Sequence, residues 1–321
     1  MPPFLRLFKF VAVIIALTAR KNRRIINCVM KLTDKIQGVI CIVSSAFFFS
    51  LMSLFVRLAG DMPLFQKCFF RNLVALIAIT VFMLIKRERF IPKKEARPFI
   101  LGRAIFGLVG IVLNFAAINN LNIADAAILN KMSPFFAVVL SYVFLKEKIT
   151  PVDIFALIFA FGGAMLVVKP SFNFKSLYAF GGLIGGISVG AAYTFLRAVG
   201  KKGESGSKIV FWFSLISTLA FTPFLIIFYE PIKPMQLLFM CLAGVSAATA
   251  QFFVTGAYTK AAAKDISVFD YSQVIFTAVL GLIFLKQYPD VWSVIGYVII
   301  IATAVIKWRL NAKKDKMINS D

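Results

Sequence analysis

The strongest constraint on this chain is a series of apolar segments, each about as long as a membrane is thick. Ten such segments lie near residues 37–58, 64–85, 98–118, 122–145, 151–168, 177–199, 208–229, 235–258, 266–285 and 290–308. A helix needs about 20 apolar residues to cross a bilayer, and it satisfies its own backbone hydrogen bonds there. The sequence therefore predicts an all-α integral membrane protein with ten transmembrane helices.

The second half of the chain repeats the first at a fixed offset of 140 residues. The matching positions are Arg57 with Arg197, Asp125 with Asp265, Leu140 with Leu280, and Phe144-Leu145-Lys146 with Phe284-Leu285-Lys286. Anchors that keep one offset without a gap predict two copies of a five-helix unit. Because five is an odd number, the second copy must lie inverted relative to the first, an arrangement found in many transporters.

This repeat predicts a division of the chain into four parts. They are a basic N-terminal extension at 1–36, a first five-helix repeat at 37–168, a second at 177–308, and a cytoplasmic tail at 309–321. Met30-Lys31-Leu32 resembles an ordinary bacterial start, so residues 1–29 are interpreted as an upstream extension. An interfacial helix is the alternative for the same residues.

Charge indicates how the chain lies in the membrane. The net charge is +22, but the cations lie in short clusters between apolar segments, which is typical of cytoplasmic loops and not of a nucleic-acid-binding face. With a cytoplasmic N-terminus, the inner connections hold thirteen cations and the outer ones five. We predict a multi-pass protein of the cell (inner) membrane with both termini cytoplasmic, in contact with membrane lipid and not with nucleic acid.

Composition argues against an enzyme. Only 16% of the residues are charged, histidine is absent, and the four cysteines show no C-x-x-C pairing. The commonest general base and metal ligand is therefore missing. No segment resembles a nucleotide-binding loop, so this chain is not expected to hydrolyse ATP. We predict no catalytic residue, no metal site and no cofactor.

Polar side chains inside the predicted helices form the candidate site. A charged group near the centre of a spanning helix costs about 2.5–3.5 kcal/mol, so it should face protein or a water-filled cavity. The equivalent pairs Asn130-Lys131 and Asp270-Tyr271 would bracket such a cavity at the centre of the membrane. The predicted substrate-binding residues are Arg71, Asn114, Asn130, Lys131, Tyr193, Gln251, Asp270, Tyr271 and Gln273.

The balance of these charges bears on the substrate. Arg103 and Asp270 are expected at similar depth and could pair, which leaves Arg71 and Lys131 without an intramembrane partner. Unpaired cations that face a cavity favour an anionic substrate group, such as a carboxylate or phosphate. Arg71 could instead snorkel to its helix end. Asp270 is either an ionised partner of Arg103 or a site that couples the substrate to protons.

Two further features predict how the helices pack. Gly182, Gly186 and Gly190 lie four residues apart, a spacing that lets helix backbones approach closely; a hinge at Gly185-Gly186 is the alternative. Pro134 is expected to kink the fourth helix in the middle of the membrane.

The chain resembles the EamA-type transporters of the drug/metabolite transporter superfamily over residues 37–308. The likeness rests on Arg71, on Asp125-Ala126-Ala127 through Pro134, on the corner Phe144-Leu145-Lys146-Glu147-Lys148-Ile149-Thr150, and on Gly162-Gly163. It implies ten helices in two inverted sets of five, cytoplasmic termini and carriage of small organic solutes. The second repeat departs from the pattern at Val274 and Gln287, so equal gating roles for the two halves are not expected.

The leading hypothesis is a secondary transporter that moves a small organic metabolite, an amino acid or related carboxylate-bearing solute, by alternating access. Proton coupling or exchange would supply the energy. The region from Asp270 to Asp290 also resembles S-adenosylmethionine uptake carriers and general drug/metabolite exporters. A membrane-embedded enzyme and a structural membrane protein are the non-transport alternatives. The sequence determines neither the direction of transport nor whether the protein forms a homodimer.

Overall fold

The computed structural model describes residues 34–120, 129–168, 177–286 and 288–318, and every regular element among them is helical. Nine stretches are long and apolar enough to cross a membrane, and a shorter apolar helix occupies Ser133–Leu145. The predicted extension up to residue 33 and the helix-opening Asp125 lie outside the described residues. The long helices are α3 (Asp34–Leu58), α4 (Leu64–Ile85), α5 (Arg97–Asn120), α7 (Ser133–Leu145), α8 (Pro151–Val168), α9 (Leu177–Lys201), α10 (Gly206–Ile227), α11 (Pro234–Lys260), α13 (Ser272–Leu285) and α14 (Val291–Ile318).

The repeat is visible in the backbone. Helices α7 and α13 both end on a lysine in the left-handed conformation, Lys146 and Lys286, each with φ of 54°. A side chain other than glycine adopts this conformation at a cost of about 1–2 kcal/mol, so its recurrence is specific. The two positions lie 140 residues apart, as the sequence register predicts.

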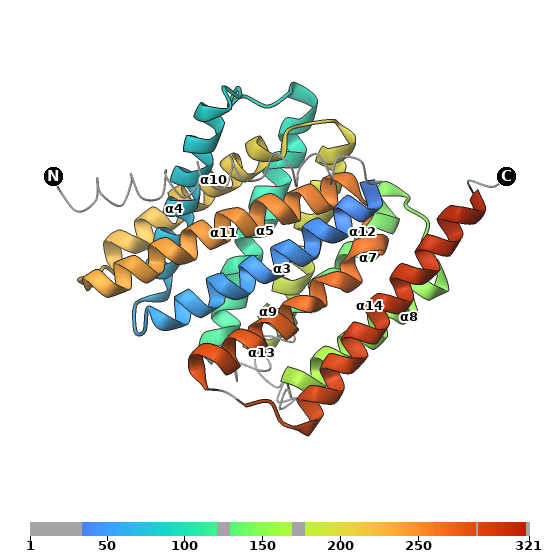
Figure 1. Cartoon of the computed structure of the whole chain (residues 1–321). Coiled ribbons are helices and arrows are strands. Elements are labelled where there is room, and N and C mark those ends of the chain that lie inside the picture. The colour runs from blue at the N-terminus through green and yellow to red at the C-terminus, as the bar shows by residue number, and fades with distance from the viewer. Residues whose placement is uncertain (1–33, 121–128, 169–176, 287, 319–321) are drawn as a thin grey trace.

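Packing follows the same pseudo-symmetry. The first helix of each repeat lies along the third helix of the other, α3 along α11 and α9 along α5. Helix α7 packs on α9, and its counterpart α13 packs on α3; Figure 1 shows α3 between α11 and α13. The chain is therefore a ten-helix membrane protein built from two inverted five-helix repeats that interlock through their first and third helices.

The glycine ladder of α9 lies at one of these interfaces. A side-chain carbon at Gly186 would lie 2.6 Å from the carbonyl oxygen of Leu129, and one at Gly190 would lie 2.6 Å from Cβ of Phe136. Such separations are far below a van der Waals contact. The helix-packing role predicted for the ladder is confirmed, because only glycine lets α9 approach the fourth helix this closely.

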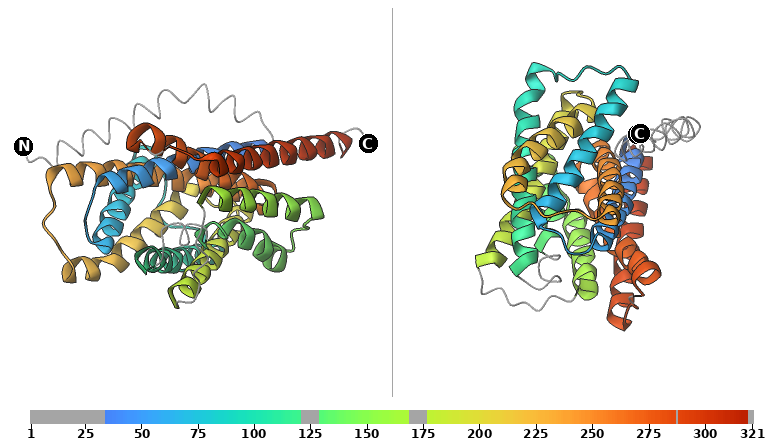
Figure 2. Two further views of the ribbon diagram at one scale, coloured as in Figure 1. Left: turned by 90° about the horizontal axis from the view of Figure 1, so that it is seen from below. Right: turned by 90° about the vertical axis from the view of Figure 1, so that its left-hand side faces the viewer.

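The fifth helices of the two repeats, α8 and α14, form a pair at one edge of the bundle (Figure 1). They cross at Gly163 and Gly296, where each glycine faces the backbone carbonyl of the other. Asp153 and Lys307, both buried, form an ion pair between them. The far end of α14 extends beyond the neighbouring helices (Figure 2).

Candidate functional site

The fourth and ninth helices are both interrupted inside the membrane. In the first repeat a turn at Lys131-Met132 precedes α7. In the second repeat α12 (Ala263–Ile266) and the 3-10 turn η2 (Ser267–Tyr271) precede α13. Non-helical backbone at membrane depth is tolerated where it is buried in protein or lines a water-filled cavity.

The sequence suggested that Pro134 kinks the middle of the fourth helix, and this prediction is wrong. Pro134 lies in the first turn of α7, where its missing N–H costs nothing. The second repeat is interrupted at the equivalent place although it carries Val274 there. The break is therefore a property of both repeats and does not depend on proline.

The two breaks meet across the interface between the repeats. Lys131 Nζ lies 3.6 Å from Asp270 Oδ2 and donates a 2.7 Å hydrogen bond to Gln273 Oε1. The Tyr271 hydroxyl donates a 3.0 Å hydrogen bond to the Lys131 carbonyl. Only 16% of the Lys131 side chain and 6% of the Asp270 side chain are exposed. Groups from both repeats thus form one polar cluster, which we call the break cluster: Lys131, Asp270, Tyr271 and Gln273.

This geometry corrects the charge pairing expected from the sequence. Asp270 pairs with Lys131 and not with Arg103, so Lys131 is not an unpaired cation. The expectation failed because equal depth in the membrane does not fix which faces of two helices meet. The inverted breaks turn residue 131 of one repeat toward residue 270 of the other.

Arg103 on α5 has different partners. It donates a 3.0 Å hydrogen bond to Gln251 Oε1 on α11, and its guanidinium lies 4.2 Å from the ring centroid of Phe213. A cation over an aromatic face is attracted by the ring quadrupole, more strongly where water is excluded. Gly107, one turn along α5, leaves space for this guanidinium, because a side-chain carbon there would clash with it. Sequence reasoning missed Gly107 and Phe213.

Arg71 on α4 is a buried cation that has no counter-charge among the described residues. The residue is 8% exposed, and no acid among the described residues pairs with it. Its Nε is buried without a hydrogen-bond partner, and so is the Nδ2 of Asn72 beside it. Arg103 lies within electrostatic range of Arg71, and its own Nε is likewise unsatisfied. Burial of the side chain shows that Arg71 does not snorkel to the surface.

Tyrosines surround the break cluster. Tyr193 on α9 stacks on Tyr258 of α11, with ring centroids 4.5 Å apart. Tyr258 is fully buried, and its hydroxyl lies 3.3 Å from Ser267 Oγ in η2. Both rings are electrostatic neighbours of Asp270. Sequence reasoning missed Tyr258, although a tyrosine near the end of a long apolar helix is a signal that could have found it.

The structure thus brings most of the predicted residues together, around the break cluster and around Arg103. Asn130 is half-buried directly before Lys131. Asn114 lies where α5 packs against Gly185 of α9, and no contact joins its side chain to the cluster within the described part of the chain.

One end of the bundle is held by an ionic network, which we call the corner latch: Glu147, Arg197 and Lys201. Glu147, in the corner after α7, accepts a 2.8 Å hydrogen bond from Arg197 Nε and lies 3.3 Å from Lys201 Nζ. Arg197 also donates to the Thr259 carbonyl of α11, at 3.3 Å. The latch therefore joins the fourth, sixth and eighth helices. Sequence reasoning treated Arg197 only as a helix-end cation.

Two inverted repeats whose broken helices meet at a buried polar cluster define a membrane transporter. The chain belongs to the EamA-like transporter family, whose model matches residues 36–169 and 176–308. It is thus a multi-pass membrane protein and a transporter of small molecules, not an enzyme.

Similarity to individual proteins extends over most of the chain. The pseudopaline exporter CntI of Pseudomonas aeruginosa is 29% identical over 271 residues, which cover 84% of this chain and 94% of the relative. Solute carrier family 35 member G1 of Homo sapiens is 27% identical, with 86% of this chain and 81% of the relative covered. A solved crystal structure has the same fold, with a TM-score of 0.71 at 14% identity, covering 85% of this chain and 98% of that chain.

Proposed function

We propose that the chain is a secondary transporter that carries a small organic solute with an anionic group, such as a carboxylate, by alternating access. It would lie in the inner membrane with both termini cytoplasmic, as the cation-rich connections favour. The observation that carries the proposal is Arg71, a buried guanidinium that has no counter-charge among the described residues and lies within electrostatic range of a second guanidinium, that of Arg103.

Two cations within electrostatic range of each other and without an acid are costly in a membrane, and a bound anion would offset that cost. A carboxylate can accept two parallel hydrogen bonds from one guanidinium, and this fixes its orientation as well as its position. Gln251 and Phe213 already hold Arg103, so Arg71 has the most to gain from a bound anion. In this proposal Arg71 is the main substrate ligand.

The break cluster supports alternating access. Its contacts join Lys131 of the first repeat to Asp270 and Gln273 of the second, so rocking one repeat against the other would break them. The corner latch holds one end closed. The pseudo-symmetric counterpart of the latch differs, because Gln287 stands in the second repeat where the first has Glu147. Arg57, the first-repeat counterpart of Arg197, is exposed and has no partner among the described residues.

Asp270 offers a route to proton coupling. A proton on its carboxylate would remove the attraction that holds Lys131 and so favour separation of the two breaks. We therefore expect Asp270→Asn to abolish pH-driven accumulation and to spare exchange of solute across the membrane. Concentrative uptake that survives in Asp270→Asn would exclude this coupling site.

Export is the favoured direction, because a relative that matches 84% of this chain is named an exporter. Uptake of S-adenosylmethionine remains the alternative. Purified protein in liposomes would be screened with amino acids, S-adenosylmethionine and nucleotide derivatives, with and without a pH gradient. Accumulation of an anionic solute supports the proposal, whereas turnover of any of these compounds would indicate an enzyme.

Arg71→Gln tests the binding role directly. Hydrogen bonds to charged groups contribute about 1.5–3 kcal/mol, so the apparent affinity for the transported anion should fall roughly 10- to 150-fold. Arg57→Gln removes an exposed arginine of the same repeat and is the matched control. Equal affinities for Arg71→Gln and Arg57→Gln would exclude Arg71 as the substrate ligand.

A further inference from the structure

A cavity of about 420 Å³ lies away from the break cluster, between the α4–α5 connection, the start of α5 and α10. This volume lies within the range of about 300–1,000 Å³ that is typical of small-molecule sites. Arg97 is the only charged residue in its lining. The lining residues are Ile91, Pro92, Arg97, Ile100, Leu101, Trp212 and Ile216.

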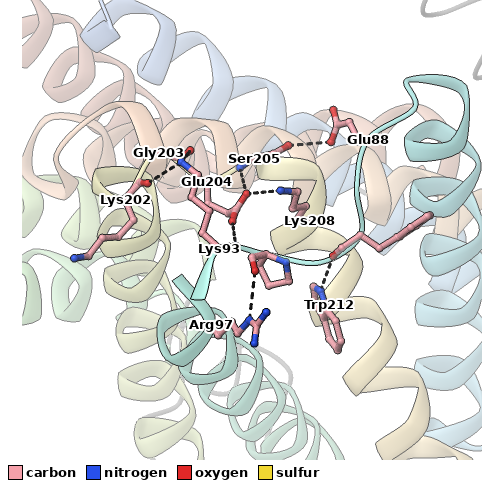
Figure 3. Close-up of polar contacts among 11 residues, drawn as sticks. Glu88, Lys93, Arg97, Lys202, Gly203, Glu204, Ser205, Lys208 and Trp212 are labelled. Atoms are coloured by element: carbon pink, nitrogen blue, oxygen red, sulfur yellow. Dashed lines mark hydrogen bonds and ion pairs between the residues drawn. The ribbon is translucent and has the colours of Figure 1, made fainter. Parts of the chain in front are cut away.

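Two hydrogen bonds fix the walls of this cavity. The indole Nε1 of Trp212 donates to the Phe90 carbonyl at 3.0 Å, and Arg97 Nε donates to the Pro92 carbonyl at 3.3 Å (Figure 3). The Trp212 ring is therefore held as one wall. The two terminal nitrogens of the Arg97 guanidinium have no partner among the described residues, so they remain available to a ligand.

The α4–α5 connection is also tied to the α9–α10 connection. Glu204 accepts a 2.6 Å hydrogen bond from the Lys93 backbone N–H, and Lys93 Nζ donates to the Gly203 carbonyl at 3.1 Å (Figure 3). Glu204 is further engaged by Lys208, and Glu88 by the hydroxyl of Ser205. The nearby acids Glu204 and Glu88 thus already have hydrogen-bond partners. The contacts between the two connections also mean that the cavity is formed without a ligand.

The surroundings of the cavity are amphipathic. Ile91 and Leu101 in its lining are 68% and 51% exposed, as expected of side chains that meet lipid. The connection from residue 86 to residue 97 holds six cations against two acids. A tryptophan at this level is typical of the membrane–water boundary. Apolar walls, a free guanidinium and a basic rim together match a lipid with a negatively charged head group.

We propose that this cavity binds an anionic phospholipid from the adjacent leaflet, with its phosphate on Arg97 and the start of an acyl chain against Ile100, Trp212 and Ile216. Basic pockets between transmembrane helices recognise such head groups. The occupant would brace the α4–α5 and α9–α10 connections, which belong to different repeats. This site is separate from the proposed solute site, and it does not depend on the identity of the solute.

Trp212 is a built-in reporter for the test. In a full-length Trp292→Phe/Trp308→Phe background it is the only remaining tryptophan. The protein would be placed in two sets of phosphatidylcholine vesicles that contain the same mole fraction of a brominated lipid. The brominated lipid is phosphatidylglycerol in one set and phosphatidylcholine in the other, with the bromine near the head-group end of the acyl chain. We expect phosphatidylglycerol to occupy the site roughly fivefold more strongly, as judged by quenching of Trp212, because one cation near the surface contributes about that factor.

Arg97→Gln should nearly abolish the preference for phosphatidylglycerol over phosphatidylcholine. Arg89→Gln removes the same charge from an exposed side chain of the same connection, and it should leave most of this preference intact. Excess unlabelled phosphatidylglycerol should reverse the quenching, and glycerol phosphate in solution should not. Equal quenching by the two lipids in the parent protein, or equal losses in Arg97→Gln and Arg89→Gln, would overturn the proposal. Neither measurement requires transport, and both leaflets carry the same lipids, so orientation does not affect the result.

Discussion

The two repeats have the same backbone fold but carry different polar side chains. Their fourth helices, α7 and α13, end on left-handed lysines at equivalent positions, and both are interrupted before they begin. The central cations Arg71, Arg103 and Lys131 all lie in the first repeat. The second repeat supplies the groups that face them: Gln251, Asp270 and Gln273. The second repeat thus supplies partners to Lys131 and Arg103 of the first, whereas Arg71 has no counter-charge among the described residues.

The two ends of the bundle differ in the same way. Glu147 closes the corner of the first repeat by binding Arg197 and Lys201. Arg57, the counterpart of Arg197, is exposed and has no partner in the described part of the chain. The duplicated backbone thus forms two equivalent corners, and among the described residues an ionic network holds the first of them.

The largest expected effect comes from breaking complementarity at the centre. Asp270→Ala leaves Lys131 as a buried cation without its counter-charge, so we expect a loss of about 3–5 kcal/mol in stability. Asp270→Ala/Lys131→Met should recover most of that loss, because it removes both charges. Unfolding midpoints in detergent would measure this cycle, with the exposed Asp61→Ala as control. Additive losses in the double variant would show that the halves do not depend on each other.

The fold could be predicted from the sequence much better than the pairing within the site. Segment length, hydropathy and the 140-residue register belong to single segments, so ten helices in two inverted repeats could be derived from them. The polar residues of the break cluster could also be named individually. The partner of Asp270 could not, because it depends on how two interrupted helices turn toward each other. The corner latch was missed because its acid and its cations lie about 50 residues apart.

The corner latch offers the second test of the comparison. Glu147→Ala removes both ionic contacts, and hydrogen bonds between charged groups contribute about 1.5–3 kcal/mol. The equilibrium should shift by that amount toward a conformation open at this end, which spin labels across the latch would detect as longer distances. Glu95→Ala, an exposed acid of a neighbouring connection, is the control. Unchanged distances in Glu147→Ala would mean that packing alone closes this end.

Gly107 makes a smaller and more local prediction. The counterparts of Arg103 and Gly107 in the second repeat are Ala243 and Ala247, so an alanine is accommodated where no arginine needs the space. Gly107→Ala should displace the Arg103 guanidinium and crowd the Phe213 ring, which a side-chain carbon would approach to 2.8 Å, at a cost of roughly 1–3 kcal/mol for overpacking. Gly162→Ala is the matched control, since a side-chain carbon there meets nothing within 4 Å. Equal unfolding midpoints for the two variants would contradict this role of Gly107.

The smallest effect concerns Glu204, whose counterpart in the first repeat is the apolar Leu64. Burial alone would raise the pKa of Glu204, but hydrogen bonds from Lys208 and from the backbone N–H groups of Lys93 and Ser205 outweigh it and hold the pKa below its ordinary value. A carboxyl with a lowered pKa stabilises the fold above its unfolded pKa of about 4.3, and this contribution is lost as the pH falls through the folded value.

The connections at this end should therefore loosen below about pH 4, whereas the opposite end, which has no such carboxylate at the equivalent position, should not respond to this change. Glu204→Gln should lower the unfolding midpoint slightly at pH 7, by on the order of 0.5 kcal/mol, and this difference from the unmodified protein should disappear on acidification. A difference that stays constant with pH would show that Glu204 acts through packing and not through its charge. The asymmetry between the ends would then rest on the corner latch alone.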